Sequence, residues 1–160
     1  MRFTVTAAVL LALYYFPYPA GSLVRRWINA YLHGYALIAA SVLRWRETAI
    51  QVVDSTIIGR FSLRVVQTCD AMDIIILFVS AIVSWPGPWR RRGLAAGAGV
   101  LLIGVANVLR IVSLYFIGTS WPSSFESFHL EVWPVVLIAV ALGSFVWLSR
   151  WISAGPPRAA

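Results

Sequence analysis

The chain has 160 residues, of which 60% are hydrophobic and 12% are charged. Soluble domains carry about 25% charged residues, so this composition excludes an ordinary soluble protein. It predicts one membrane-embedded domain over residues 1–155, followed by a flexible tail at 156–160. The net charge of +7 comes from arginines that cluster between apolar runs, which points to membrane lipids and not to nucleic acid as partners.

The first apolar run covers residues 3–20, preceded by Arg2 and interrupted near its end by Pro17 and Pro19. A cleaved signal peptide would need a small residue where Tyr18 stands. An uncleaved transmembrane helix is therefore favoured over a signal peptide.

Residues 23–46 have the pattern of an amphipathic helix, with arginine and other polar residues on one face. The apolar face is predicted to consist of Val24, Trp27, Ile28, Tyr31, Tyr35, Ile38, Val42 and Trp45. Such a helix can lie in the membrane interface. The alternative is a second transmembrane helix with arginine at both ends.

Residues 48–68 are rich in β-branched side chains, with turn signals at Asp54-Ser55 and Gly59. This pattern predicts a short β-hairpin-like segment. Because open strand edges cannot be satisfied in lipid, we expect the segment to lie outside the hydrocarbon.

Three further apolar runs, at about 70–86, 93–118 and 130–150, predict transmembrane helices. The short loop between the first two contains Arg90, Arg91 and Arg92, which places that loop on the cytoplasmic side. The sequence thus predicts an all-α integral membrane helix bundle of about four or five transmembrane helices, with an extracytoplasmic β-hairpin-like segment. The helix at residues 23–46 either crosses the membrane or lies in its interface.

Three ionisable or nucleophilic residues fall at the outer ends of these runs: Cys69, Arg110 and His129. Each has an ordinary explanation, because a lone cysteine can be a small buried hydrophobe, an arginine can extend to the headgroups and an interfacial histidine can be solvated. The loop charges nevertheless place all three at one depth. A thiol, an imidazole and a guanidinium are sufficient for acyl transfer, as nucleophile, acid/base and oxyanion donor.

Three more polar residues are candidates for positioning a substrate. Asn107 lies one helical turn before Arg110 and is expected on the same face. Asp70 and Asp73 follow the cysteine and suit the first turn of a helix. The two histidines are too few and too far apart to predict a metal site, and no cofactor motif is found.

The sequence resembles the exosortase/archaeosortase family of membrane-embedded cysteine transpeptidases, most closely the short exosortases of the H type. The resemblance covers about residues 48–150 and rests on "VVQTCDAMDIIILFVSAIVSWPGPWRRRGLAAG", "NVLRIVSLYFIG" and "FHLEVWP". One difference is Ala71, since the family usually has glycine at the second position after the cysteine. Asp73 is also unusual beside a nucleophilic thiol.

The resemblance implies that Cys69 is the nucleophile, Arg110 the oxyanion and substrate donor, and His129 the acid/base. It implies cleavage of C-terminal sorting signals of exported proteins and transfer to a lipid- or glycan-linked acceptor. It further implies a multi-pass protein of the bacterial inner membrane with its active site facing the periplasm.

Two other functions are compatible with the residues. A cysteine-dependent protease or acyltransferase would use the same three side chains with a different acceptor. A non-catalytic scaffold or small transporter would use Arg110 and Asn107 to hold its helices together and leave Cys69 inert.

Overall fold

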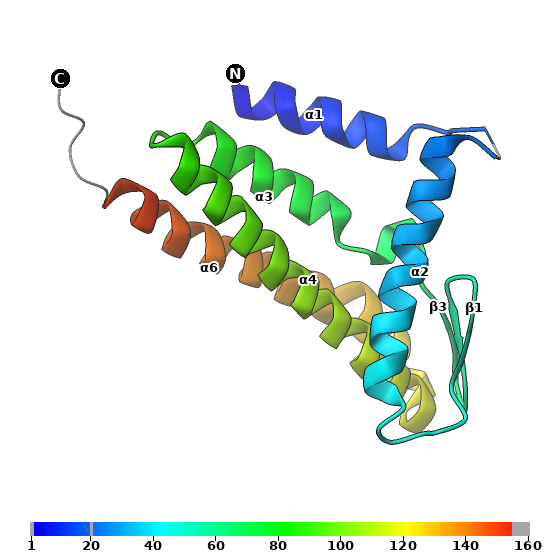
Figure 1. The fold of residues 1–160 in the computed structure, drawn as a ribbon. Helices are drawn as coiled ribbons and strands as arrows, with labels where there is room; N and C mark the ends of the chain where they lie inside the picture. The colour runs from blue at the N-terminus through cyan, green and yellow to red at the C-terminus, as the bar shows by residue number, and fades with distance from the viewer. Residues whose placement is uncertain (1, 20, 155–160) are drawn as a thin grey trace, which may run out of the picture. The chain divides into compact units, whose positions relative to one another are not determined.

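The computed structural model describes residues 2–19 and 21–154 (Figure 1). The predicted tail at 156–160 lies outside the described residues. The chain divides into two compact units, one formed by Met1–Phe16, Met72–Gly104 and Leu137–Ala160, the other by Pro17–Ala71 and Val105–Val136. Each is described by itself.

All regular secondary structure in the described part of the first unit is helical. It contains α1 (Arg2–Tyr15), α3 (Met72–Ser84), the first half of α4 (Trp89–Ser120) and most of α6 (Trp133–Ser153). Helices α1 and α3 pack against each other (Figure 1). Helix α3 is favoured by its aliphatic composition and by its lack of internal proline, and the sequence "WPGP" ends it.

The predicted arginine-containing loop is shorter in the structure, because α4 begins at Trp89 and includes Arg90, Arg91 and Arg92. Two of these arginines bind to backbone groups of this same unit. Arg92 Nη1 donates to the carbonyl of Val83 at 2.7 Å. Arg91 Nη1 donates to the carbonyl of Trp151 at 3.0 Å, and its guanidinium lies 5.3 Å from the centre of that indole ring. The guanidinium groups therefore satisfy carbonyls near the ends of α3 and α6, as cations near helix C-termini commonly do.

The second unit combines helix α2 (Leu23–Leu43) with three short antiparallel strands in the order β1-β2-β3. The strands are Gln51–Val53, Thr56–Ile58 and Ser62–Arg64, and α2 packs on β1 and β2 (Figure 1). In the first turn Asp54 has φ 53°, a conformation that aspartate tolerates better than most residues. His33 Nδ1 of α2 contacts the Asp54 carbonyl and fixes this turn.

The face of α2 that packs inside the protein is largely separate from the apolar face identified in the sequence. Trp27, Ile38 and Trp45 are exposed, whereas the buried positions are small or aliphatic. The buried residues of α2 are Ile28, Leu32, Ala36, Ala39, Ala40 and Leu43. Alanines allow close approach of the backbone to its neighbours, while the large apolar side chains point outward, as expected where lipid covers the surface.

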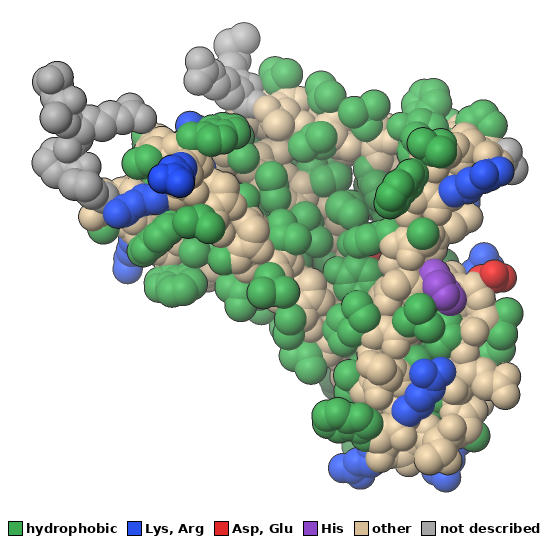
Figure 2. Space-filling view, in the orientation of Figure 1, with side chains coloured by type: hydrophobic (Ala, Val, Ile, Leu, Met, Phe, Trp, Pro, Cys, Tyr) green, Lys and Arg blue, Asp and Glu red, His purple; other side chains and the backbone are tan. Residues whose placement is uncertain are grey.

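Two helical segments of the described chain are long and apolar enough to cross a membrane, Trp89–Ser120 and Pro122–Ser153. Hydrophobic side chains cover much of the visible face in Figure 2. The predicted helices at 3–20 and 70–86 are shorter in the structure, Arg2–Tyr15 and Met72–Ser84, because Pro17 and Pro86 limit their C-terminal extension. The number of transmembrane helices, the path of α2 and the extracytoplasmic location of the strands stay predictions.

Candidate functional site

Cys69 ends a 3₁₀ turn formed by Gln67–Cys69, where its N–H donates to the Val66 carbonyl at 2.8 Å. The sequence placed this thiol at the start of a helix. In the structure Asp70 and Ala71 separate Cys69 from α3, so the thiol is on a turn. The side chain is half-buried.

Arg110 is positioned by α4 and is only 6% exposed. Its Nη2 donates to the main-chain carbonyl of His129 at 3.3 Å and lies 3.5 Å from His129 Nδ1. The guanidinium is thus buried against another segment of the second unit, and does not extend along the surface as a snorkelling side chain would.

His129 lies in a π-helical turn, Phe128–Val132, just before α6. The N–H of Trp133 donates to the carbonyl of Phe128, five residues earlier. Pro134 follows and has no N–H to offer, which explains why regular α-helical bonding is disturbed here. The wider turn presents the imidazole toward the thiol, and Pro134 was the only sequence signal for it.

The imidazole of His129 joins the other two groups. Its Nε2 lies 3.5 Å from Cys69 Sγ, while Nδ1 and the backbone carbonyl face Arg110. A guanidinium can only donate hydrogen bonds, so its bond to Nδ1 requires a lone pair there, whereas its bond to the carbonyl exists in every protonation state. Proton transfer from sulfur to Nε2 requires the tautomer with its proton on Nδ1, in which Arg110 keeps only its bond to the carbonyl. In that tautomer the geometry permits proton exchange between sulfur and imidazole beside a fixed positive charge.

Asn107 is fully buried on α4. Neither its amide nitrogen nor its amide oxygen has a hydrogen-bond partner among the described residues. A buried carboxamide without a partner is unfavourable, and the predicted role of Asn107 in positioning a substrate stays a prediction.

The two acidic candidates have different environments. Asp70 is fully buried, and its carbonyl accepts a hydrogen bond from the Tyr31 hydroxyl at 3.5 Å. Asp73 is exposed in the first turn of α3, within the other unit. Their predicted roles in substrate positioning stay predictions, and Asp73 has the ordinary role of an acid at a helix N-terminus.

Sequence reasoning missed the aromatic support of His129. The ring of Phe125 stacks on the imidazole, with centroids 5.7 Å apart and planes at 13°. Phe61, next to β3, packs on Phe125 at 5.3 Å. Gly118 of α4 admits the Phe61 ring, since a Cβ at this position would lie 2.6 Å from two ring atoms. Only the folded chain brings these residues together.

Ala71 has φ 57°, in the left-handed region, and is 4% exposed. This is the position where the family resembled by the sequence usually has glycine. The backbone therefore keeps a glycine-like conformation although a methyl group is present. Left-handed backbone costs an L-residue about 1–2 kcal/mol, so the turn after Cys69 holds local strain.

No group of three metal-ligating side chains is found within residues 2–19 and 21–154. The described site thus consists of a thiol, an imidazole and a guanidinium, carried by a 3₁₀ turn, a π-helical turn and helix α4.

Comparison with known proteins identifies the family. A search of curated proteins and a search of solved structures found no match. The family model described as transmembrane exosortase (Exosortase_EpsH) matches residues 1–147, which is most of the chain. This match confirms the resemblance to exosortases, and it confirms that the chain is a membrane protein. The chain therefore belongs to the transmembrane exosortase family.

Proposed function

We propose that this chain is a cysteine transpeptidase or endopeptidase that cuts the C-terminal sorting signals of exported proteins at the outer membrane–water interface. The observation that carries the proposal is the 3.5 Å contact between Cys69 Sγ and His129 Nε2, with Arg110 on the other side of the ring. Family membership implies sorting-signal processing in general.

In the proposed reaction, a proton passes from Cys69 to His129, and the thiolate attacks the carbonyl carbon of the scissile peptide bond. Negative charge develops on the carbonyl oxygen, and Arg110 is the available cation to stabilise it. The imidazolium then gives its proton to the leaving amine, which releases the signal helix and leaves a thioester on sulfur.

In the second half, neutral His129 takes a proton from the incoming nucleophile, and the thioester collapses as the proton returns to sulfur. With an amine on a lipid- or glycan-linked acceptor the product is a new amide. With water it is a free acid. The substrate's signal helix would lie in the bacterial inner membrane with its cleavage point on the periplasmic side.

The test is co-expression with a reporter that the wild-type chain processes, carrying a C-terminal helix, a basic tail and a tag at each end. We expect no processing with Cys69→Ala and a loss of about 10²–10⁴-fold with His129→Gln, which is the usual contribution of general acid–base catalysis. The matched control is His33→Gln, because this second histidine contacts a turn and not the thiol. Processing by Cys69→Ala at the wild-type level would refute the proposal.

Mass spectrometry of the new C-terminus distinguishes the candidate reactions. An amide-linked adduct identifies a transpeptidase, and a free acid identifies an endopeptidase. Modification of an acceptor that does not require cleavage of a sorting signal would identify the cysteine-dependent acyltransferase.

A further inference from the structure

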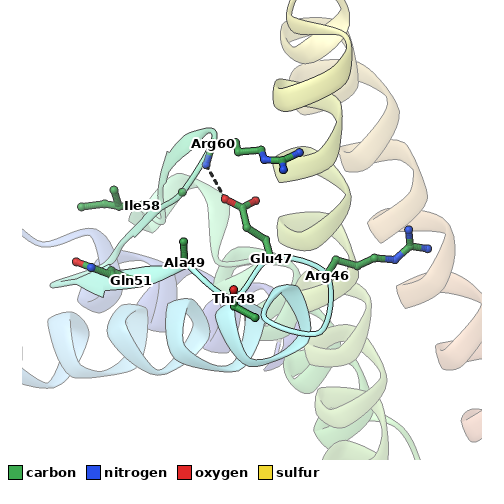
Figure 3. Close-up of a pocket in the computed structure, with 8 residues that line it drawn as sticks. Arg46, Glu47, Thr48, Ala49, Gln51, Ile58 and Arg60 are labelled. Atoms are coloured by element: carbon green, nitrogen blue, oxygen red, sulfur yellow. Dashed lines mark hydrogen bonds between the residues drawn. The ribbon is translucent and has the colours of Figure 1, made fainter.

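A polar cavity lies where the loop after α2 meets the turn between β2 and β3, away from the three groups described above. It has a volume of about 620 Å³ and its lining includes Arg46, Glu47 and Arg60 (Figure 3). The guanidinium groups of Arg46 and Arg60 make no hydrogen bond or ion pair with another described residue. Both arginines are exposed, so their guanidinium groups are open to a ligand.

Glu47 lines the same cavity, but its carboxylate bonds to Tyr115 and to the backbone of Arg60 and to neither guanidinium. The charged side chains of the lining, two arginines and one glutamate, therefore leave a net charge of +1. Oε2 accepts from the Tyr115 hydroxyl at 2.8 Å, and Oε1 accepts from the backbone N–H of Arg60 at 3.0 Å. Figure 3 shows the second bond, from the backbone nitrogen of Arg60 to the Glu47 carboxylate. Gly59 permits this arrangement, since a Cβ there would overlap the Tyr115 hydroxyl.

A second, less polar cavity of about 490 Å³ is lined by Val42, Trp45, Arg46 and Phe116. Arg46 lines both cavities. Trp45 is 89% exposed and Phe116 is 41% exposed, so both offer open apolar surface. A charged cavity and an apolar cavity that share one arginine suit a ligand with a charged end and an apolar end.

The position of Phe116 on α4 is consistent with the headgroup region of a bilayer. Arg91 is near the start of this helix, and Phe116 is 25 residues later, or about 38 Å along the axis at 1.5 Å per residue. The hydrocarbon core is about 30 Å thick. Tryptophan is also enriched at membrane–water interfaces.

We propose that these two cavities form a binding site for an anionic phospholipid. The phosphate would bind Arg46 and Arg60, because guanidinium groups recognise phosphate oxygens through paired hydrogen bonds. The acyl chains would lie along Trp45 and Phe116. This proposal does not depend on the proposed function, since none of these residues is among the recorded side-chain partners of Cys69 or His129.

The test is native mass spectrometry of the purified full chain in non-ionic detergent, titrated with phosphatidylglycerol. We expect about fivefold weaker binding for Arg46→Gln and for Arg60→Gln, since an arginine near anionic lipid contributes about 1 kcal/mol. Trp45→Ala should also weaken binding. The matched control is Arg26→Gln, another exposed arginine of the same unit, which should bind as wild type does.

Three outcomes would overturn the proposal. Equal weakening by Arg26→Gln would mean that only net charge matters. Unchanged binding in Trp45→Ala would remove the apolar half. Full displacement of the lipid by millimolar inorganic phosphate would identify a site for a soluble anion. If a glutamine variant fails to fold, Arg60→Lys keeps the charge and loses the paired hydrogen bonds, so intermediate binding is expected.

Discussion

Gly118→Ala should disturb the aromatic packing behind His129. The added Cβ would lie 2.6 Å from the Cε1 and Cζ atoms of Phe61, whereas ordinary contact begins at 3.4 Å, so the ring must move by 3.4 − 2.6 = 0.8 Å. Phe61 packs on Phe125, which stacks on the imidazole, so a movement of the Phe61 ring is transmitted to His129 through Phe125.

The magnitude follows from two opposing effects. Overpacking of a folded interior costs about 1–3 kcal/mol. Replacing glycine with alanine within a helix returns up to about 1 kcal/mol through helix propensity. Gly97 isolates the second effect, because it lies on the same helix and a Cβ there would meet nothing within 4 Å. Gly118→Ala should therefore be about 1–3 kcal/mol less stable than Gly97→Ala.

The assay is thermal unfolding of both purified variants in one detergent, together with reporter processing. For a chain of this size 1 kcal/mol corresponds to about 2–4 °C, so the two Tm values should differ by roughly 2–12 °C. Processing should decrease in Gly118→Ala and stay at the wild-type level in Gly97→Ala.

Phe61→Leu supplies the decisive comparison. The double variant Gly118→Ala/Phe61→Leu should be more stable than the sum of the two single changes predicts, by about 1 kcal/mol or more. Equal Tm values for the two alanine variants, or strict additivity in the double variant, would refute the reasoning about this contact.

Two further predictions concern the backbone after Cys69 and the hydrogen bond between Tyr115 and Glu47. Ala71→Gly relieves about 1–2 kcal/mol of left-handed strain, but it loses a buried methyl worth about 0.8 kcal/mol and raises the entropy of the unfolded state by about 0.4–1 kcal/mol. The Tm of Ala71→Gly should therefore stay near wild type, while Ala71→Val should lower the Tm clearly. The reverse order would contradict the left-handed conformation of residue 71. Tyr115→Phe removes a hydrogen bond to Glu47 and should destabilise the chain by about 1–3 kcal/mol, measured as Tm; a Glu47→Gln background should reduce this loss, and an unchanged loss there would show that the bond to the carboxylate is not its cause.

Local pattern was sufficient for much of the helical structure. The run predicted at 93–118 corresponds to α4, Trp89–Ser120, because a long apolar sequence without internal proline has one favourable conformation in lipid. The β-branched residues after Thr48 form strands in the structure. The amphipathic pattern identified an apolar face of residues 23–46 but not the residues of α2 that pack inside the protein, because small alanines carry no hydrophobic signal of their own.

The candidate site was predictable as a set of residue types and not as an arrangement. Arg110 and His129 could be selected because ionisable side chains are costly near lipid, and Cys69 because the loop charges place it at the same depth. Phe125 and Phe61 carry no chemical signal and lie 64 residues apart in sequence, so their packing depends on tertiary structure. The π-helical turn likewise depends on how the chain accommodates Pro134.

The bond between Arg110 and the carbonyl of residue 129 affects how variants of this site can be interpreted. A backbone acceptor is present whatever side chain residue 129 carries. His129→Gln therefore removes the imidazole while the guanidinium keeps an anchor. Arg110→Gln instead frees the segment that carries the imidazole, so its effect combines two losses. The histidine variant is the cleaner report on proton transfer.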